Sequence, residues 1–103
     1  MLTQQTAIEM VKQFANELTE SGLHLHNVFL FGSFAKSMQH EHSDIDVAIV
    51  ADEFTGVGFE DLKWFVKILK KYYLIQPKTY NTKYFSESDP FIVEINKYAI
   101  KIN

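Results

Sequence analysis

Residues 32–50 read GSFAKSMQHEHSDIDVAIV and follow an apolar run that ends at Phe31. An apolar run that stops at a glycine predicts a buried strand, here over residues 25–31. Large apolar residues alternate with polar or smaller ones in the second half of the stretch, which predicts another strand over residues 45–51. The turn between the two strands begins at Gly32. A strand, a glycine turn and a second strand that opens on acidic residues therefore decide the fold.

Two aspartates lie at the start of the second predicted strand, and ten residues separate Ser33 from Asp44. Because strand residues two apart project from the same face, Asp44 and Asp46 can point at one spot. Carboxylates there repel each other unless a cation lies between them, and Mg²⁺ commonly binds one or two carboxylates plus substrate phosphates. Gly32 lets backbone N–H groups approach phosphate oxygens, Ser33 adds a hydroxyl, and Lys36 adds a positive charge. The pattern predicts a site for a metal-bridged nucleoside triphosphate.

Two amphipathic helices are expected outside this stretch. Apolar residues recur at helical spacing over residues 6–20, where Thr6 and Glu9 match a capping box and Gly22 suits the position after the helix end. A second helix is expected over residues 59–72, and its lysines are interpreted as a solvated face. The expected apolar stripe of this second helix comprises Leu62, Phe65, Val66 and Leu69.

Three short elements are expected in the last third of the chain. A strand begins over residues 73–75, and Pro77 indicates that it ends early or lies at a sheet edge. Ser88, Asp89 and Pro90 mark the start of a helix, and residues 100–102 can close the chain as an edge strand. The inner face of that last helix is expected to carry Phe91, Ile95 and Tyr98.

The order of these elements predicts an α/β (α+β) protein with a small mixed sheet and helices packed against it. A length of 103 residues fits one domain, residues 1–103. The net charge of −3 argues against a polynucleotide substrate, because domains that grip nucleic acid usually carry a basic surface. The absence of cysteine excludes thiolate metal sites and, with no signal-like start, favours the cytoplasm. No apolar run is long enough to span a membrane.

The segment GSFAKS…SDIDVAIV resembles the nucleotidyltransferase superfamily typified by DNA polymerase beta. More narrowly, it is similar to the minimal nucleotidyltransferases (MNT proteins), small domains often paired with a HEPN-domain protein. The resemblance implies the nucleotidyltransferase fold and the ligands ATP and Mg²⁺, with Asp44 and Asp46 as catalytic and metal-binding residues and Gly32, Ser33 and Lys36 as nucleotide-binding residues. It also implies an antitoxin that transfers AMP to a hydroxyl, such as a tyrosine, of a HEPN ribonuclease toxin.

Three positions depart from that family pattern. Lys36 and Ser37 stand where Arg and Gly are usual, so the fork geometry that holds phosphate is lost and the turn is restricted if it needs a positive φ. The third acidic residue common in the superfamily would lie on the strand after the middle helix, and Gln76 occupies the matching position. Gln cannot act as a base, which puts catalysis in question while leaving metal and ATP binding in place.

Three functions therefore stay open. The first is an active transferase that modifies a partner protein, and the second is a non-catalytic binding module that neutralises a toxin by docking alone. The third, a transferase acting on a small molecule such as an aminoglycoside, needs an acceptor domain for which this chain has no room. His40 and His42 are interpreted as loop residues, since imidazole suits Zn²⁺ rather than Mg²⁺. The interface of a binding module would use the aromatic residues Trp64, Tyr72, Tyr73 and Tyr80.

Overall fold

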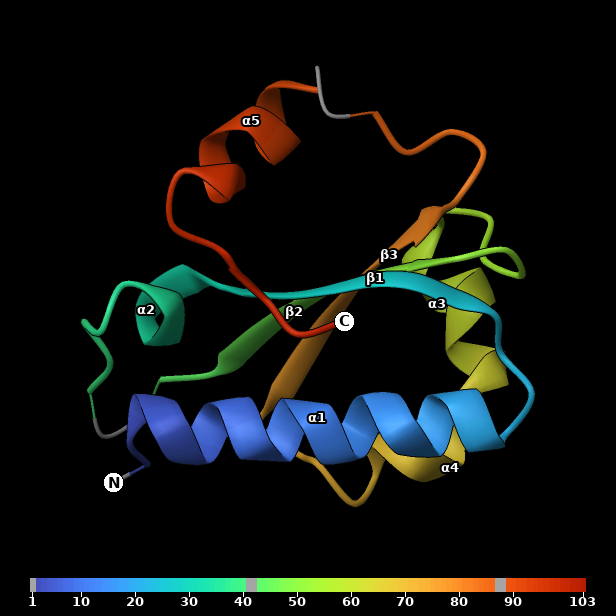
Figure 1. Ribbon diagram of the computed structural model, residues 1–103. Coiled ribbons are helices and arrows are strands. Elements are labelled where there is room, and N and C mark those ends of the chain that lie inside the picture. Colours follow the sequence, from blue (N-terminus) through green and yellow to red (C-terminus); the bar gives the residue numbers. More distant parts are fainter. Residues whose placement is uncertain (1, 41–42, 87–88) are drawn as a thin grey trace.

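The computed structural model describes residues 2–40, 43–86 and 89–103, and within them a four-stranded mixed sheet has helices on both faces (Figure 1). The strand order is β3-β2-β1-β4, with β1 antiparallel to β2 and to β4, and β2 parallel to β3. This architecture confirms the predicted α/β class with a small mixed sheet. The strands are β1 (Leu25–Phe31), β2 (Ile45–Ala51), β3 (Ile75–Asn81) and β4 (Ile100–Lys101).

The first helix, α1 (Gln4–Glu20), begins earlier than predicted. Thr3, not Thr6, is the N-cap: its hydroxyl oxygen accepts a hydrogen bond of 3.1 Å from the Thr6 N–H. The predicted end is confirmed, since Gly22 has a φ of +108° and donates its N–H to the Thr19 carbonyl. The Leu23 N–H reaches back to the Leu18 carbonyl, and the two bonds form a Schellman motif.

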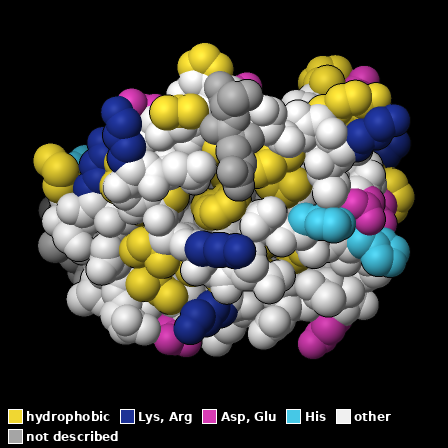
Figure 2. Space-filling view, turned by 45° about the horizontal axis from the view of Figure 1, so that its top comes forward, with side chains coloured by type: hydrophobic (Ala, Val, Ile, Leu, Met, Phe, Trp, Pro, Cys, Tyr) yellow, Lys and Arg dark blue, Asp and Glu magenta, His cyan; other side chains and the backbone are white. Residues whose placement is uncertain are grey.

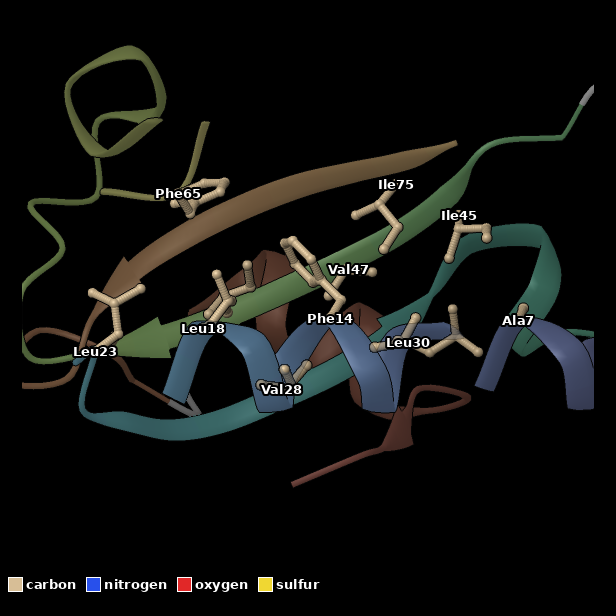
Figure 3. Close-up of a cluster of buried hydrophobic side chains, with 14 of the residues drawn as sticks. Ala7, Phe14, Leu18, Leu23, Val28, Leu30, Ile45, Val47, Phe65 and Ile75 are labelled. Carbon is tan, nitrogen blue, oxygen red and sulfur yellow. The ribbon is translucent and has the colours of Figure 1, made fainter. Parts of the chain in front are cut away.

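One face of the sheet packs against α1, and their contact forms the main hydrophobic core (Figure 3). Phe14 is fully buried, and its ring meets those of Phe65 and Tyr72 edge-on. A buried Phe or Leu contributes about 1.5–3 kcal/mol, whereas a surface ion pair such as Glu17–Lys71 contributes at most about 1 kcal/mol. Apolar burial therefore holds α1 on the sheet. The other labelled members are Ala7, Leu18, Leu23, Val28, Leu30, Ile45, Val47 and Ile75.

The single helix expected over residues 59–72 is wrong, because the segment is broken into three short helices. These are α3 (Gly58–Asp61), η1 (Leu62–Trp64) and α4 (Val66–Leu69). The break lies at Phe65, whose φ of −143° and ψ of 13° leave the helical region while its ring enters the core beside Phe54. Of the predicted apolar stripe, Phe65 is buried and Leu62 and Leu69 pack on the core, but Ile68 takes the place expected for Val66.

Strand β3 continues through Pro77 to Asn81, so the early end predicted at Pro77 is wrong. The alternative, an edge position, is confirmed, because β3 is the outermost strand on its side of the described sheet. A proline is tolerated at an edge when its missing N–H would face away from the neighbouring strand.

The second face of the sheet is covered in part by α5 (Pro90–Asn96) and the segments around it (Figure 1). Asp89 caps this helix as predicted: its Oδ1 accepts a hydrogen bond of 2.8 Å from the Phe91 N–H. The predicted inner face is confirmed in part: Phe91 is 38% exposed but its ring meets that of Phe31, and Tyr98 is half-buried. Ile92, which the prediction did not include, is buried, and Ser88 lies outside the described residues. The Ile95 side chain lies outside the described parts, and the predicted closing edge strand is confirmed as β4. No helix in the described chain is long and apolar enough to cross a membrane.

Candidate active site

The two faces of β2 serve different purposes. Ile45, Val47 and Ile49 belong to the core against α1, so Asp46 projects from the opposite face. The register pairs Asp46 with Phe31 on β1 and with Gln76 on β3. These three residues form one row across the sheet, at the end where β1 leaves it and β2 and β3 enter it.

Gly32 follows this row directly and lies against the carboxylate of Asp46. A Cβ added at Gly32 would stand 2.1 Å from Asp46 Oδ2, and the residue has a φ of +73°. Both the space and the backbone conformation therefore require glycine. The predicted meeting of the glycine turn and the second aspartate is a direct contact in the structure.

The carboxylate of Asp46 is held in an environment that disfavours its charge. Burial raises the pKa of Asp46, and the negative charge of Asp44 raises it further. Asp44 is exposed and stands just before β2. A cation between the two carboxylates would remove their repulsion and offset the cost of burying Asp46.

The glycine turn continues as a short helix, α2 (Gly32–Ala35). Ser33 is half-buried, and its hydroxyl makes no hydrogen bond within the described residues. Gln4 of α1 fastens the end of the turn, because its side-chain amide donates to the carbonyls of Phe34 and Ala35 at 2.9 and 3.2 Å. Sequence reasoning missed this contact, since Gln4 is 30 residues away along the chain.

Ser37, where the family pattern has Gly, has a φ of +55°. The turn has a positive φ at this position, so the condition under which a residue other than Gly restricts it is met. A residue with a Cβ pays roughly 1–2 kcal/mol to adopt this conformation. Ser37 donates its N–H to the Phe34 carbonyl, which helps to hold the strained turn in place.

Lys36 is exposed, and its Nζ lies 4.3 Å from the centroid of the Tyr98 ring. The predicted phosphate-binding lysine is thus held by an aromatic ring from the segment after α5. The His40 N–H donates to the Ser43 hydroxyl at 2.8 Å and closes the loop before Asp44. His42 lies outside the described residues.

Gln76 is exposed and stands beside Asp46, so its predicted position in the site agrees with the register. Lys78, two residues further along β3, projects from the same face. It was missed because the prediction left open whether the strand ended at Pro77 or continued at a sheet edge. Had the strand been continued, the period of two would have identified Lys78.

The face of the molecule that carries α5 bears charged side chains of both signs. Figure 2, which brings the α5 side forward, shows basic side chains scattered among acidic and apolar ones. Histidines stand beside acidic side chains in this view, in line with the contacts of His24 with Glu53 and of His26 with Asp52.

Comparison with known proteins identifies a family and a relative of this chain. The sequence profile of the nucleotidyltransferase domain family matches residues 11–102. A relative from Methanocaldococcus jannaschii, named "Putative protein adenylyltransferase MJ0141", is 31% identical over 98 residues, which cover 85% of this chain and 97% of the relative.

Two solved structures are similar in fold. A Sulfolobus solfataricus protein, described as a "putative nucleotidyltransferase", superposes with a TM-score of 0.68 at 18% identity. The superposition covers 95% of this chain and 80% of the Sulfolobus solfataricus chain. A structure described as "the toxin-antitoxin with AMP-PNP" superposes with a TM-score of 0.60 at 18% identity, over 89% of this chain and 72% of that one. At this identity, both similarities concern the fold alone.

Proposed function

Because this chain belongs to the nucleotidyltransferase domain family and has its fold, we propose that it binds ATP with Mg²⁺ and transfers AMP to a hydroxyl of a partner protein. The observation that carries the proposal is the contact between the Gly32 backbone and the Asp46 carboxylate, with Asp44 two residues away. In this proposal Asp44 and Asp46 hold the metal ion. Gly32, Ser33 and Lys36 bind the triphosphate.

The residues present fit Mg²⁺. Within the described chain no third Asp, Glu, His or Cys gathers with the two aspartates to hold an ion by protein groups alone. A pair of carboxylates that needs further oxygens from the substrate is the arrangement that Mg²⁺ commonly adopts. When bound, Mg²⁺ neutralises charge on the triphosphate and on the departing pyrophosphate.

The transfer that this arrangement serves is an in-line displacement. The acceptor oxygen bonds to the α-phosphorus of ATP, and the bond from that phosphorus to the β-bridging oxygen breaks. Pyrophosphate leaves, and the proton of the acceptor hydroxyl passes to solvent, because Gln76 cannot take it. The work of the chain is to position the triphosphate and stabilise its charge, which is where most of the catalysis of phosphoryl transfer lies.

The acceptor is proposed to come from another chain. The described residues provide the nucleotide half of a site, and the M. jannaschii relative is named as an enzyme that adenylylates proteins. A solved toxin–antitoxin structure has the same fold. The first name supports a hydroxyl on a protein as the acceptor, and the second fits an antitoxin role for this chain. That the acceptor is a hydroxyl, such as a tyrosine, on a HEPN-domain toxin is the part of the proposal that the family resemblance implies.

A second candidate is a binding module that neutralises its partner without transfer. It is favoured by the presence of Gln76, an uncharged side chain, in register with Asp46. Two of the four aromatic residues expected at such an interface are well exposed, Tyr73 at 82% and Trp64 at 47%. Tyr72 and Tyr80 are half-buried and pack on the two hydrophobic clusters instead.

Replacing Gln76 with Glu decides between these candidates. We expect Gln76→Glu to raise AMP transfer by roughly 10²-fold, the lower range for a positioned general base. The measurement follows label from the α-phosphate of ATP into a HEPN-domain protein. Gln13→Glu on α1, across the sheet, adds the same charge away from the site and is the matched control.

An unchanged rate in Gln76→Glu, with a wild type that transfers, would show that Gln76 does not limit the reaction. If neither protein transfers AMP while both bind MgATP, the proposed enzyme is contradicted and the binding module becomes the proposed function.

A further inference from the structure

The row Phe31–Asp46–Gln76, named the carboxylate row after Asp46, has Lys78 next to it on the same face of the sheet. The register pairs Ala48 with Phe29 on one side and with Lys78 on the other, so the row Phe29–Ala48–Lys78 follows the row of Asp46. Rows on one face are two residues apart, about 6.6 Å along the strand. The long side chain of Lys78 can therefore reach the space above Asp46 and Gln76.

An aromatic ring of α5 holds the Lys78 side chain over this face. Lys78 Nζ lies 4.7 Å from the centroid of the Phe91 ring and 5.9 Å from the centroid of the Tyr80 ring. Phe91 in turn contacts Phe31, the neighbour of Asp46 in the carboxylate row, edge-on at 5.7 Å. Phe91 thus spans from β1 towards β3, and Lys78 points inward to meet it.

The charge of Lys78 has no acidic partner among the described residues. Contact with an exposed aromatic ring is weaker than a charge-assisted hydrogen bond to a phosphate oxygen. The ammonium can therefore bind a phosphate oxygen of an anionic ligand above the carboxylate row while the Phe91 ring still flanks its side chain.

Lys36 shows the same arrangement on the other side of the row. It follows the glycine turn after β1 and lies over the Tyr98 ring, whereas Lys78 lies on β3 under Phe91. Both rings come from the chain around α5. Two lysines thus flank the carboxylates. A triphosphate is still negatively charged after Mg²⁺ has bound, so its remaining charge can interact with these lysines.

We propose that Lys78 binds the triphosphate of the nucleotide as the counterpart of Lys36, and that Phe91 is its positioning residue. The inference rests on the proposed function of the site and adds a residue to it. With two lysines on the phosphates, the affinity of the chain for a nucleotide would depend more on its triphosphate than on its nucleoside. Replacing Gln76, which carries no negative charge, with a carboxylate would bring an anion close to this lysine.

Calorimetric titration of MgATP and of AMP with Mg²⁺ into the purified chain tests this. We expect Lys78→Met to weaken MgATP binding about ten-fold, the factor of one charge-assisted hydrogen bond, and to change AMP binding less than about two-fold. Lys78→Arg keeps the charge and should bind nearly as the wild type does. Lys83→Met is the matched control, since Lys83 lies 5.7 Å from the Tyr84 ring in the turn after β3.

The role of Phe91 needs its own readout. Phe91→Leu should weaken MgATP binding about three-fold in the wild type and have no further effect in Lys78→Met, because positioning acts only through the lysine. Equal binding of MgATP by Lys78→Met and wild type would overturn the inference alone. An equal loss of MgATP and AMP affinity would mark Lys78 as structural and also overturn it. No MgATP binding by the wild type would overturn the proposed function together with this inference.

Discussion

Replacing Gly32 with Ala is expected to abolish MgATP binding and to lower the free energy of unfolding by about 2–4 kcal/mol. The new Cβ would stand 2.1 Å from Asp46 Oδ2, so the carboxylate must leave its position. The φ of +73° adds strain for any residue with a side chain. With a typical stability of about 5–15 kcal/mol the variant stays folded, so its binding can be measured by calorimetry and its stability by denaturant unfolding.

Gly22→Ala separates the strain of a positive φ from the clash of a new Cβ with a neighbouring side chain. Gly22 also has a positive φ, +108°, but a Cβ there would meet nothing within 4 Å. We expect it to lose about 1–2 kcal/mol of stability and to bind MgATP as the wild type does. If Gly32→Ala binds MgATP normally, the contact between Gly32 and Asp46 is not part of the nucleotide site.

Replacing Asp61 with Ala is expected to lower the free energy of unfolding by about 3–5 kcal/mol. The buried carboxylate of Asp61 accepts hydrogen bonds from the backbone N–H groups of Thr55 and Gly56, at 2.7 and 2.9 Å. It also accepts the hydroxyls of Thr55 and Thr79, at 3.0 and 2.6 Å. These bonds tie α3 and the preceding loop to β3, and the Ala variant leaves their donors without a partner.

The pH dependence of this effect identifies the carboxylate as its source. Burial by itself raises the pKa of Asp61, but the hydrogen bonds from Thr55, Thr79 and Gly56 outweigh it and leave the pKa below its usual value. A lowered pKa stabilises the fold above the unfolded value of about 3.9, and the gain is lost as the pH falls through the folded pKa.

Asp61→Asn keeps the size of the side chain and removes this titration. The stability gap between wild type and Asp61→Asn, followed by denaturant unfolding, should therefore be constant from pH 7 to about pH 5 and shrink below about pH 4. A gap that persists unchanged at low pH would assign the loss to shape rather than to charge.

Much of the fold could be predicted from periodicity and turn residues. The strands around the glycine turn, the helix end at Gly22 and the cap at Asp89 follow local rules, and the structure has them as expected. The break at Phe65 could not be predicted, because helical spacing also suits Phe65 and only the core beside Phe14 and Phe54 draws its ring inward.

The arrangement of the candidate site could be predicted only in part. A period of two predicts that Asp44 and Asp46 point at one spot, and the family resemblance places Gln76 beside them, where the register pairs it with Asp46. The contact of Gly32 with Asp46 requires the antiparallel register of β1 and β2, which residue types do not determine. Lys78 was not identified because the sequence left open whether the strand ended at Pro77 or continued at a sheet edge, where a proline is tolerated.

Calorimetric titration of ATP in the presence of Mg²⁺, into the wild type and into the double variant Asp44→Asn, Asp46→Asn, tests the central claim most directly. The variant keeps the size of both side chains and removes both charges from the site. The account predicts that the wild type binds MgATP and that the double variant loses this binding while its thermal unfolding stays close to that of the wild type. Equal binding by the two proteins, or no binding by a folded wild type, would contradict the assignment of Asp44 and Asp46 as the metal-bridged nucleotide site.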